Sequence, residues 1–180
     1  MSLKSLEAGP NVMSFHAFEQ AIESPTLRLI AQYWNQVRGS RAMPGWGNIR
    51  PSQITAHLPI IWSYKYDRVA DAFTGRLAGD KIEQIFGKGF RGVPMAELYP
   101  AENFPKFFLK SKRVVCEPAL YIGKGMVFKY VDRHGQGERI IMPLADDGVL
   151  GDGIFGATVY QSLLGAPAAD DSEHESWFPL

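Results

Sequence analysis

Seven aromatic residues are the strongest chemical signal in this sequence, and most of them fall in stretches that alternate like β-strands. Tyrosine and tryptophan combine apolar surface with one orienting hydrogen bond, which is typical of small-molecule sites. The candidate ligand-binding aromatics are Trp62, Tyr64, Phe73, Phe107, Phe128, Tyr130 and Tyr160. For each residue alone, a place in an ordinary aromatic core is the competing interpretation. For the group, we predict a cavity.

Arg76 is the eighth candidate. It stands in the middle of an apolar run with Phe73 before it and Leu77 and Ala78 after it. A partly buried guanidinium needs an anion or several acceptors, so Arg76 could bind the carboxylate or phosphate of a ligand. The alternative is a structural role, in which Arg76 pairs with an acid of the chain or with backbone carbonyls.

Motifs for catalysis and metal binding are missing from the sequence. It contains no nucleophile elbow, phosphate-binding loop, dinucleotide fingerprint or paired-histidine motif. None of the four histidines has a second histidine, a cysteine or a carboxylate at a metal-ligand spacing, so we expect no metal site. The sequence therefore predicts a protein that is not an enzyme.

One enzymatic interpretation stays open as an alternative. A small cone-shaped enzyme of the ketosteroid-isomerase type places an acid and a tyrosine in a cavity over a curved sheet. Tyr64, Tyr130, Asp67 and Asp132 are the residues that such a site would use. Both aspartates fall at predicted strand ends beside turns, where a solvated turn residue is the ordinary interpretation.

Length and composition limit the remaining classes. A chain of 180 residues with 46% hydrophobic residues suits one core and is short for two. Lys+Arg and Asp+Glu both number 19, so no net positive field favours nucleic acid. Neither a membrane span nor a signal peptide is expected from the hydropathy. Cys116 is the single cysteine, which fits a reducing, cytoplasmic location.

The N-terminal part divides into a leader and two helices. Residues 1–13 are predicted to form a disordered leader, and residues 14–39 two helices separated at Ser24-Pro25. The second helix carries a one-sided apolar stripe, formed by Leu27, Ile30, Trp34 and Val37. Either the back of the sheet or the same helix of a second subunit must cover this stripe. We therefore predict a homodimer that forms and signals through these helices.

Residues 40–164 are predicted to form the core domain and residues 165–180 a loose tail. Strands are expected at Ile60–Asp67, Phe73–Ala78, Ala119–Lys124, Met126–Asp132, Glu138–Leu144 and Gly153–Leu163. Of the last four, the run at Ala119 or at Glu138 is expected to be short or to merge with a neighbour, which leaves five strands. Turns are predicted at Lys124-Gly125, at residues 134–137 and at residues 146–148. Short helices are expected between the second strand and the third.

The order of these elements resembles a PAS domain, which holds its ligand between a five-stranded antiparallel sheet and a helical flank. Several blocks also resemble the stand-alone PAS-type proteins common in alphaproteobacteria. The blocks are Tyr33-Trp34 with Arg38-Gly39, Arg41-Ala42-Met43-Pro44, Pro51 with Leu58-Pro59, Arg76-Leu77-Ala78-Gly79, and Met142-Pro143-Leu144 with Asp147-Gly148. The resemblance spans roughly residues 31–160. It implies an α+β, PAS-like sensory or regulatory domain that usually dimerises and has no catalytic chemistry.

The predicted function is thus a module of signal transduction that binds a small molecule or a protein partner. A ligand-free adaptor for protein interaction, with a cavity packed by its own aromatic side chains, is an alternative of a different class. No cofactor is indicated by the sequence, because it shows neither a haem-ligand context nor a flavin-type cysteine motif. Native mass spectrometry separates the sensor from the adaptor.

Overall fold

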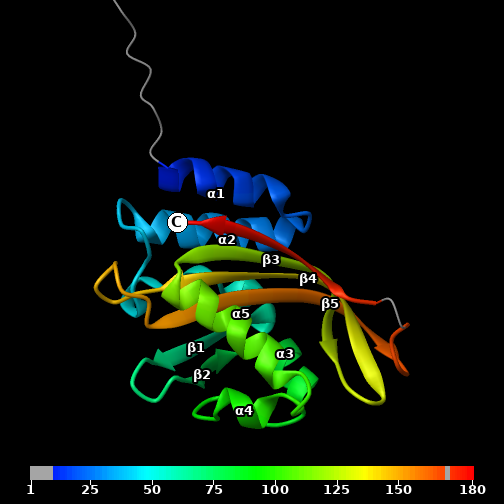
Figure 1. Ribbon diagram of the computed structural model, residues 1–180. Coiled ribbons are helices and arrows are strands. Elements are labelled where there is room, and N and C mark those ends of the chain that lie inside the picture. Colours follow the sequence, from blue (N-terminus) through cyan, green and yellow to red (C-terminus); the bar gives the residue numbers. More distant parts are fainter. Residues whose placement is uncertain (1–9, 169–170) are drawn as a thin grey trace, which may run out of the picture.

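Six antiparallel strands form the sheet around which the chain is built (Figure 1). The computed structural model describes residues 10–168 and 171–180. The strands are β1 (Ile61–Asp67), β2 (Ala72–Ala78), β3 (Ala119–Lys129), β4 (Arg133–Leu144), β5 (Gly153–Leu164) and β6 (Glu173–Pro179). Their order across the sheet is β2-β1-β5-β4-β3-β6, so strands from the two halves of the chain pair at β1 and β5.

Helices cover both faces of the sheet. One face carries α1 (Pro10–Ala21) and α2 (Pro25–Arg38), and the other carries α3 (Asp80–Phe86), α4 (Met95–Leu98) and α5 (Phe104–Cys116) (Figure 1). Three short 3-10 helices connect α2 to β1, at Trp46–Asn48, Pro51–Gln53 and Thr55–Ile60. The α+β, PAS-like architecture predicted from the sequence is confirmed, with six strands in the sheet and not five.

The apolar stripe of α2 is covered by the sheet of the same chain. Leu27, Ile30 and Trp34 are fully buried and pack in one cluster with residues of β4 and β5 such as Ile140 and Phe155. The Trp34 indole also donates a hydrogen bond to the Pro143 carbonyl, at 3.0 Å. The structure thus shows one of the two covers predicted for the stripe, and dimerisation through these helices stays a prediction.

Glu138 ties the junction between α1 and α2 to the sheet. Its carboxylate accepts hydrogen bonds from the backbone N–H groups of Glu23, at 2.9 Å, and Ser24, at 2.7 Å. The Ser24 hydroxyl caps α2 by accepting from the Leu27 N–H. Lys124 on β3 adds a hydrogen bond to the Ala21 carbonyl, at 2.9 Å. The sheet therefore binds the two N–H groups that precede α2, and the Ser24 cap binds the Leu27 N–H in its first turn.

Two predicted turns are wrong, because their glycines lie inside strands. Gly125 is part of β3, and Gly135 and Gly137 are part of β4. A Cβ on Gly135 would lie 2.1 Å from the Phe128 ring, and a Cβ on Gly137 would lie 1.9 Å from the Val159 carbonyl oxygen. These two glycines allow close contact and do not turn the chain. The β3–β4 turn falls earlier, after Lys129, and the two runs at Ala119 and Met126 merge into one strand.

The two ends of the chain also differ from the prediction. The tail expected to be loose forms β6, which pairs along β3 from Gly125↔Glu173 to Ala119↔Pro179. Its aromatic residues anchor it, since Phe178 packs against Phe18 of α1 with 5.6 Å between ring centroids. Of the predicted leader, residues 10–13 belong to α1, and residues 1–9 lie outside the described residues. Among the helices described, none has both the length and the hydropathy that a membrane span requires.

The position of Gly137 inside a strand can be tested by adding one methyl group. We expect Gly137→Ala to lower the free energy of unfolding by about 2 kcal/mol, because its Cβ would overlap the Val159 carbonyl. Gly89→Ala is the control, since nothing lies within 4 Å of a Cβ at that position, and we expect a change within about 0.5 kcal/mol. Urea denaturation measures both. Equal stabilities of the two variants would contradict the placement of Gly137.

Candidate functional site

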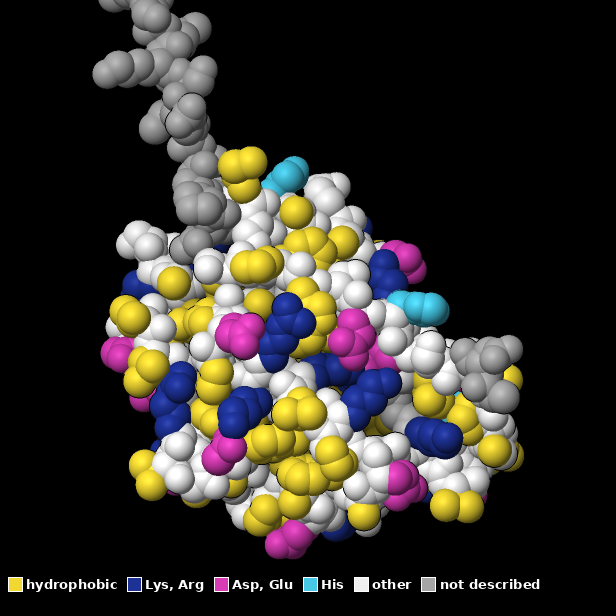
Figure 2. All heavy atoms as spheres, in the orientation of Figure 1, with side chains coloured by type: hydrophobic (Ala, Val, Ile, Leu, Met, Phe, Trp, Pro, Cys, Tyr) yellow, Lys and Arg dark blue, Asp and Glu magenta, His cyan; other side chains and the backbone are white. Residues whose placement is uncertain are grey.

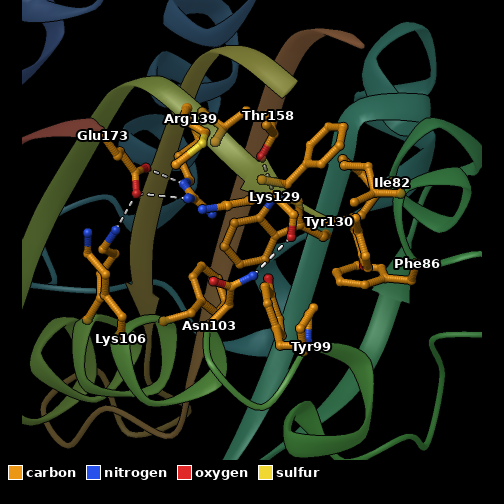
Figure 3. Close-up of a pocket in the computed structure, with 18 of the residues that line it drawn as sticks. Ile82, Phe86, Tyr99, Asn103, Lys106, Lys129, Tyr130, Arg139, Thr158 and Glu173 are labelled. Carbon is orange, nitrogen blue, oxygen red and sulfur yellow. Dashed lines mark hydrogen bonds and ion pairs between the residues drawn. The ribbon is translucent and has the colours of Figure 1, made fainter. Parts of the chain in front are cut away.

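A cavity of about 140 Å³ lies between the sheet and the helices α3 and α5 (Figure 3). Its wall is mostly aromatic and aliphatic, with a few charged and polar side chains. The lining comprises Trp62, Tyr64, Ile82, Ile85, Phe86, Phe90, Tyr99, Pro100, Asn103, Lys106, Phe107, Lys110, Met126, Val127, Phe128, Lys129, Tyr130, Arg139, Thr158 and Glu173. A volume of this order suits a compound of about one ring, because a cavity of roughly 150 Å³ can hold benzene.

Ring contacts hold the aromatic wall in place. Tyr64 packs against Phe90 with 4.7 Å between ring centroids, and Tyr99 stacks on Phe107 at 4.5 Å. Trp62 donates a hydrogen bond from its indole nitrogen to the Thr158 hydroxyl, at 2.9 Å. The indole is therefore satisfied within the protein and has no donor left for a ligand.

Five of the eight candidate residues line this cavity. They are Trp62, Tyr64, Phe107, Phe128 and Tyr130. Phe73 is buried behind the wall, where its ring packs against Tyr66 at 4.6 Å. Tyr160 packs edge-on against Phe128, and its hydroxyl donates to the Lys81 carbonyl at 2.6 Å, so it supports the wall from outside.

Arg76 is placed away from this cavity and does not line it. Its side chain is exposed on β2, where the guanidinium lies over the Trp46 ring at 4.4 Å from the centroid. Strand alternation explains the difference, because Phe73 and Gly75 face the aromatic core and Arg76 points to the opposite side. Because the side chain is exposed, water can solvate the guanidinium, and the cation–π contact adds to its stability without an anion.

A buried group of charges lies at one end of the cavity (Figure 3). Glu173 of β6 accepts two hydrogen bonds from Arg139 of β4, one from Nε and one from Nη2 at 2.8 Å. The Lys110 ammonium of α5 also pairs with Glu173, and it lies 3.0 Å from Glu175. The side chains of Lys110, Glu173 and Arg139 are all exposed by less than a tenth.

Gly123 makes room for this group. A Cβ at this position would lie 1.9 Å from Oε1 of Glu173 and 2.7 Å from the Tyr121 hydroxyl. The missing side chain on β3 therefore opens a slot into which the Glu173 carboxylate fits beside Arg139. A strand glycine that allows close approach is a common device at such sites.

Opposite charges determine the ionisation of Glu173. Burial acts to raise the pKa of Glu173, but the charges of Arg139 and Lys110 outweigh it and hold this pKa below its ordinary value. Burial acts to lower the pKa of Arg139, and the Glu173 carboxylate raises it above the usual value. The pair is therefore an ion pair, and Glu173 is poorly suited to donate or accept a proton in a reaction.

The hydroxyl of Tyr64 is an unsatisfied polar group in the cavity wall. Tyr64 is 1% exposed, and no residue that the structure describes meets its hydroxyl at hydrogen-bond geometry, although the Tyr99 hydroxyl is near enough to act on its pKa. Burial raises the pKa of Tyr64, and the neighbouring Tyr99 raises it further, so the phenol stays protonated. A buried donor without a partner costs free energy, and such a group in a cavity points to a ligand acceptor.

The acids of the alternative isomerase site lie elsewhere. Asp67 is exposed at the β1–β2 turn, where its carboxylate accepts from the backbone N–H groups of Val69 and Ala70, which lowers its pKa. Asp132 is 76% exposed beside Arg133. Neither aspartate lines the cavity with Tyr64 and Tyr130. Within the described residues, no group of three His, Cys, Asp or Glu side chains could hold a metal ion.

Sequence reasoning missed the three charged residues of the buried group, although each one leaves a signal. Arg139 alternates with Ile141 on one face of a predicted strand, which places a charge on a buried side. Lys110 falls on the apolar stripe of α5, three residues after Phe107. Glu173 alternates with Glu175 and Trp177 in a segment judged too acidic to be ordered.

Comparison with known proteins agrees with the fold. A family model described as a PAS domain matches residues 22–159. The chain belongs to the PAS domain family. A search of curated proteins and a search of solved structures each give no match. The PAS match ends within β5, so the sheet strand that carries Glu173 lies beyond the matched residues of this PAS domain.

Because of its buried ion pair, Glu173 is expected to contribute more to stability than the nearby Glu175. We expect Glu173→Gln to lower the free energy of unfolding by about 3 kcal/mol, because Arg139 and Lys110 would stay buried with less compensation. Glu175→Gln is the matched control, and we expect a loss below about 1 kcal/mol, since Glu175 is 32% exposed. Chemical denaturation at pH 7 compares the two. Equal losses of stability in the two variants would show that the buried ion pair contributes no more to stability than the partly exposed Glu175 does.

The same pair predicts how stability depends on pH. The pKa of Glu173 is lower in the folded than in the unfolded chain, so its contribution is fully present above the ordinary value of 4.5 and is lost as the pH falls through the folded value. We expect the stability difference between the wild type and Glu173→Gln to be constant from pH 7 to pH 5 and to shrink below pH 4.5. Denaturation curves across this range measure it, and a difference that grows on acidification would contradict the assignment.

Proposed function

We propose that this PAS domain is a regulatory module of signal transduction that binds a small molecule in the cavity between the sheet and α3 and α5. The observation that carries the proposal is the buried Tyr64 hydroxyl, which lines the cavity without a hydrogen-bond partner among the described residues. The aromatic wall supplies apolar contact for the ligand and the hydroxyl supplies orientation. The lone Cys116 supports a reducing, cytoplasmic location.

The sheet offers a route from the cavity to the N-terminal helices. Arg139 faces the cavity, and the adjacent Glu138 faces the other side and holds the start of α2. β6 gives a second connection, because Glu173 pairs with Arg139 while Phe178 packs against Phe18 of α1. A ligand that contacts Arg139 would shift the equilibrium between arrangements of β6 and α1, and so change a surface offered to a partner or a second subunit.

The charges in the cavity support a binding role over a catalytic one. General acid–base catalysis near neutral pH needs a group whose pKa lies near 7. Glu173 is the carboxylate that lines the cavity, and Arg139 and Lys110 hold its pKa low against the effect of burial. The cavity also weighs against the adaptor alternative, which requires an interior filled by the protein's own aromatic side chains.

Native mass spectrometry of freshly purified protein tests the proposal. We expect a retained small molecule that is lost on denaturation. We also expect Ile82→Phe to abolish the extra mass, because Ile82 lines the cavity and the larger ring fills part of it (Figure 3). Ile54→Phe is the control, since Ile54 is equally buried but belongs to the core under α2.

Three results would decide the matter. Extra mass in the wild type and Ile54→Phe but not in Ile82→Phe places the ligand in the cavity. Extra mass in all three proteins places it elsewhere. A clean spectrum of the wild type, with no compound that binds on addition, favours the adaptor.

A further inference from the structure

At the end of the cavity where Glu173 lies, free hydrogen-bond donors outnumber free acceptors. Both oxygens of the Glu173 carboxylate are engaged, Oε1 with Arg139 and Oε2 with Arg139 and Lys110. The Thr158 hydroxyl already accepts from the Trp62 indole. A ligand group that brought donors of its own to this end would find few acceptors there, and a donor left unpaired is costly in a buried site.

One nitrogen of the Arg139 guanidinium, Nη1, is available to a ligand. The Nε and Nη2 groups bind Glu173, whereas Nη1 makes no hydrogen bond with the residues that the structure describes. The side chain is 9% exposed and lines the cavity, and Figure 3 shows it reaching from β4 toward the middle of the site. The guanidinium is held in place by Glu173 and by the Phe107 ring, at 5.1 Å from the centroid. Such a fixed donor suits a carboxylate oxygen.

Tyr64 provides a second donor in the same cavity. Its phenol is buried and unpartnered among the described residues, and a carboxylate is the acceptor that forms the strongest hydrogen bond with a phenol. The aromatic wall of Trp62, Phe86 and Phe107 around it can enclose only an apolar body. The donors therefore suit a carboxylate at one end of the ligand, and the aromatic wall suits an apolar body at the other end.

Charge adds to this pattern. Four cationic side chains line the cavity, Lys106, Lys110, Lys129 and Arg139, against one carboxylate, that of Glu173. Lys106 and Lys129 are exposed and form no ion pair in the described part of the chain. Figure 2 shows several Lys and Arg side chains on this face of the molecule, with Asp and Glu side chains among them. The chain as a whole has no net charge, so the excess of cationic groups is local to the cavity lining.

We infer that the ligand is a small organic acid bound as its anion, with an apolar or aromatic body against the ring wall and its carboxylate on the donors of Arg139 and Tyr64. This inference rests on the proposed function and names the class of compound that the same cavity takes. The carboxylate shares Arg139 with Glu173, so ligand binding acts directly on the residue that holds β6 in place.

Three compounds of nearly the same shape test the inference: benzoate, benzamide and benzamidine. They carry a negative charge, no charge and a positive charge, respectively, on the same ring. We expect benzoate to bind roughly tenfold more tightly than benzamide, and benzamidine to bind more weakly than either, as measured by isothermal titration calorimetry on the full chain. The affinity for benzoate should fall as salt is added, while the affinity for benzamide should stay the same.

Two tyrosine variants separate a binding role from a structural one. Tyr64→Phe removes only the unpartnered hydroxyl, so we expect unchanged or slightly higher stability and a roughly tenfold loss of affinity for benzoate. Tyr66→Phe is the control, because the Tyr66 hydroxyl donates to Asp71 at 2.6 Å and Tyr66 does not line the cavity. It should bind benzoate like the wild type.

The outcomes separate this inference from the proposed function. Preference for benzamide or benzamidine overturns the inference and leaves a cavity that binds small molecules. Equal losses of affinity in Tyr64→Phe and Tyr66→Phe overturn the placement of the carboxylate. Binding of none of the three compounds overturns the inference as well, and the retained mass in the native spectrum then decides the proposed function by itself.

Discussion

The interaction on which the rest of the structure depends is the buried contact among Glu173, Arg139 and Lys110. Charges this deeply buried are tolerated only when their partners are close and well oriented, because desolvation would otherwise exceed the attraction. The contact therefore requires β6 to lie along β3, Gly123 to carry no side chain, and α5 to bring Lys110 over the sheet. It also explains the chemistry of the cavity, since Glu173 uses its acceptors and leaves donors facing the open space.

The sheet joins the two sides of this PAS domain through the simple alternation of its side chains. Ile140 and Met142 of β4 pack under α2, whereas Arg139 and Ile141 face the cavity side. β4 and β6 thus contact both the cavity and the N-terminal helices on the other face. A strand such as β4 contributes side chains both to the core under α2 and to the cavity side, so it connects the two faces of the sheet directly.

Sequence patterns predicted the class of fold and much of the cavity wall, because hydrophobic periodicity reports directly which residues are buried. They failed for Gly135 and Gly137, where glycine permits contact with Phe128 and Val159 and not a turn; a sequence does not show what a glycine is packed against. They could not show where Arg76 lies, because its contact with Trp46 joins residues thirty positions apart. The tail was misjudged because its acidic residues suggested solvation, while Glu173 has its cationic partners on β4 and α5, more than thirty residues away.

The pKa of the Glu173 carboxyl, followed by carbon NMR during an acid titration, tests the central contact most directly. The account predicts that this pKa lies below the ordinary value of 4.5, because Arg139 and Lys110 stabilise the anion more than burial destabilises it. A value clearly above 4.5 would contradict the account. It would mean that the carboxyl is buried without its cationic partners, that β6 is not held by an ion pair, and that an acid able to exchange protons faces the cavity.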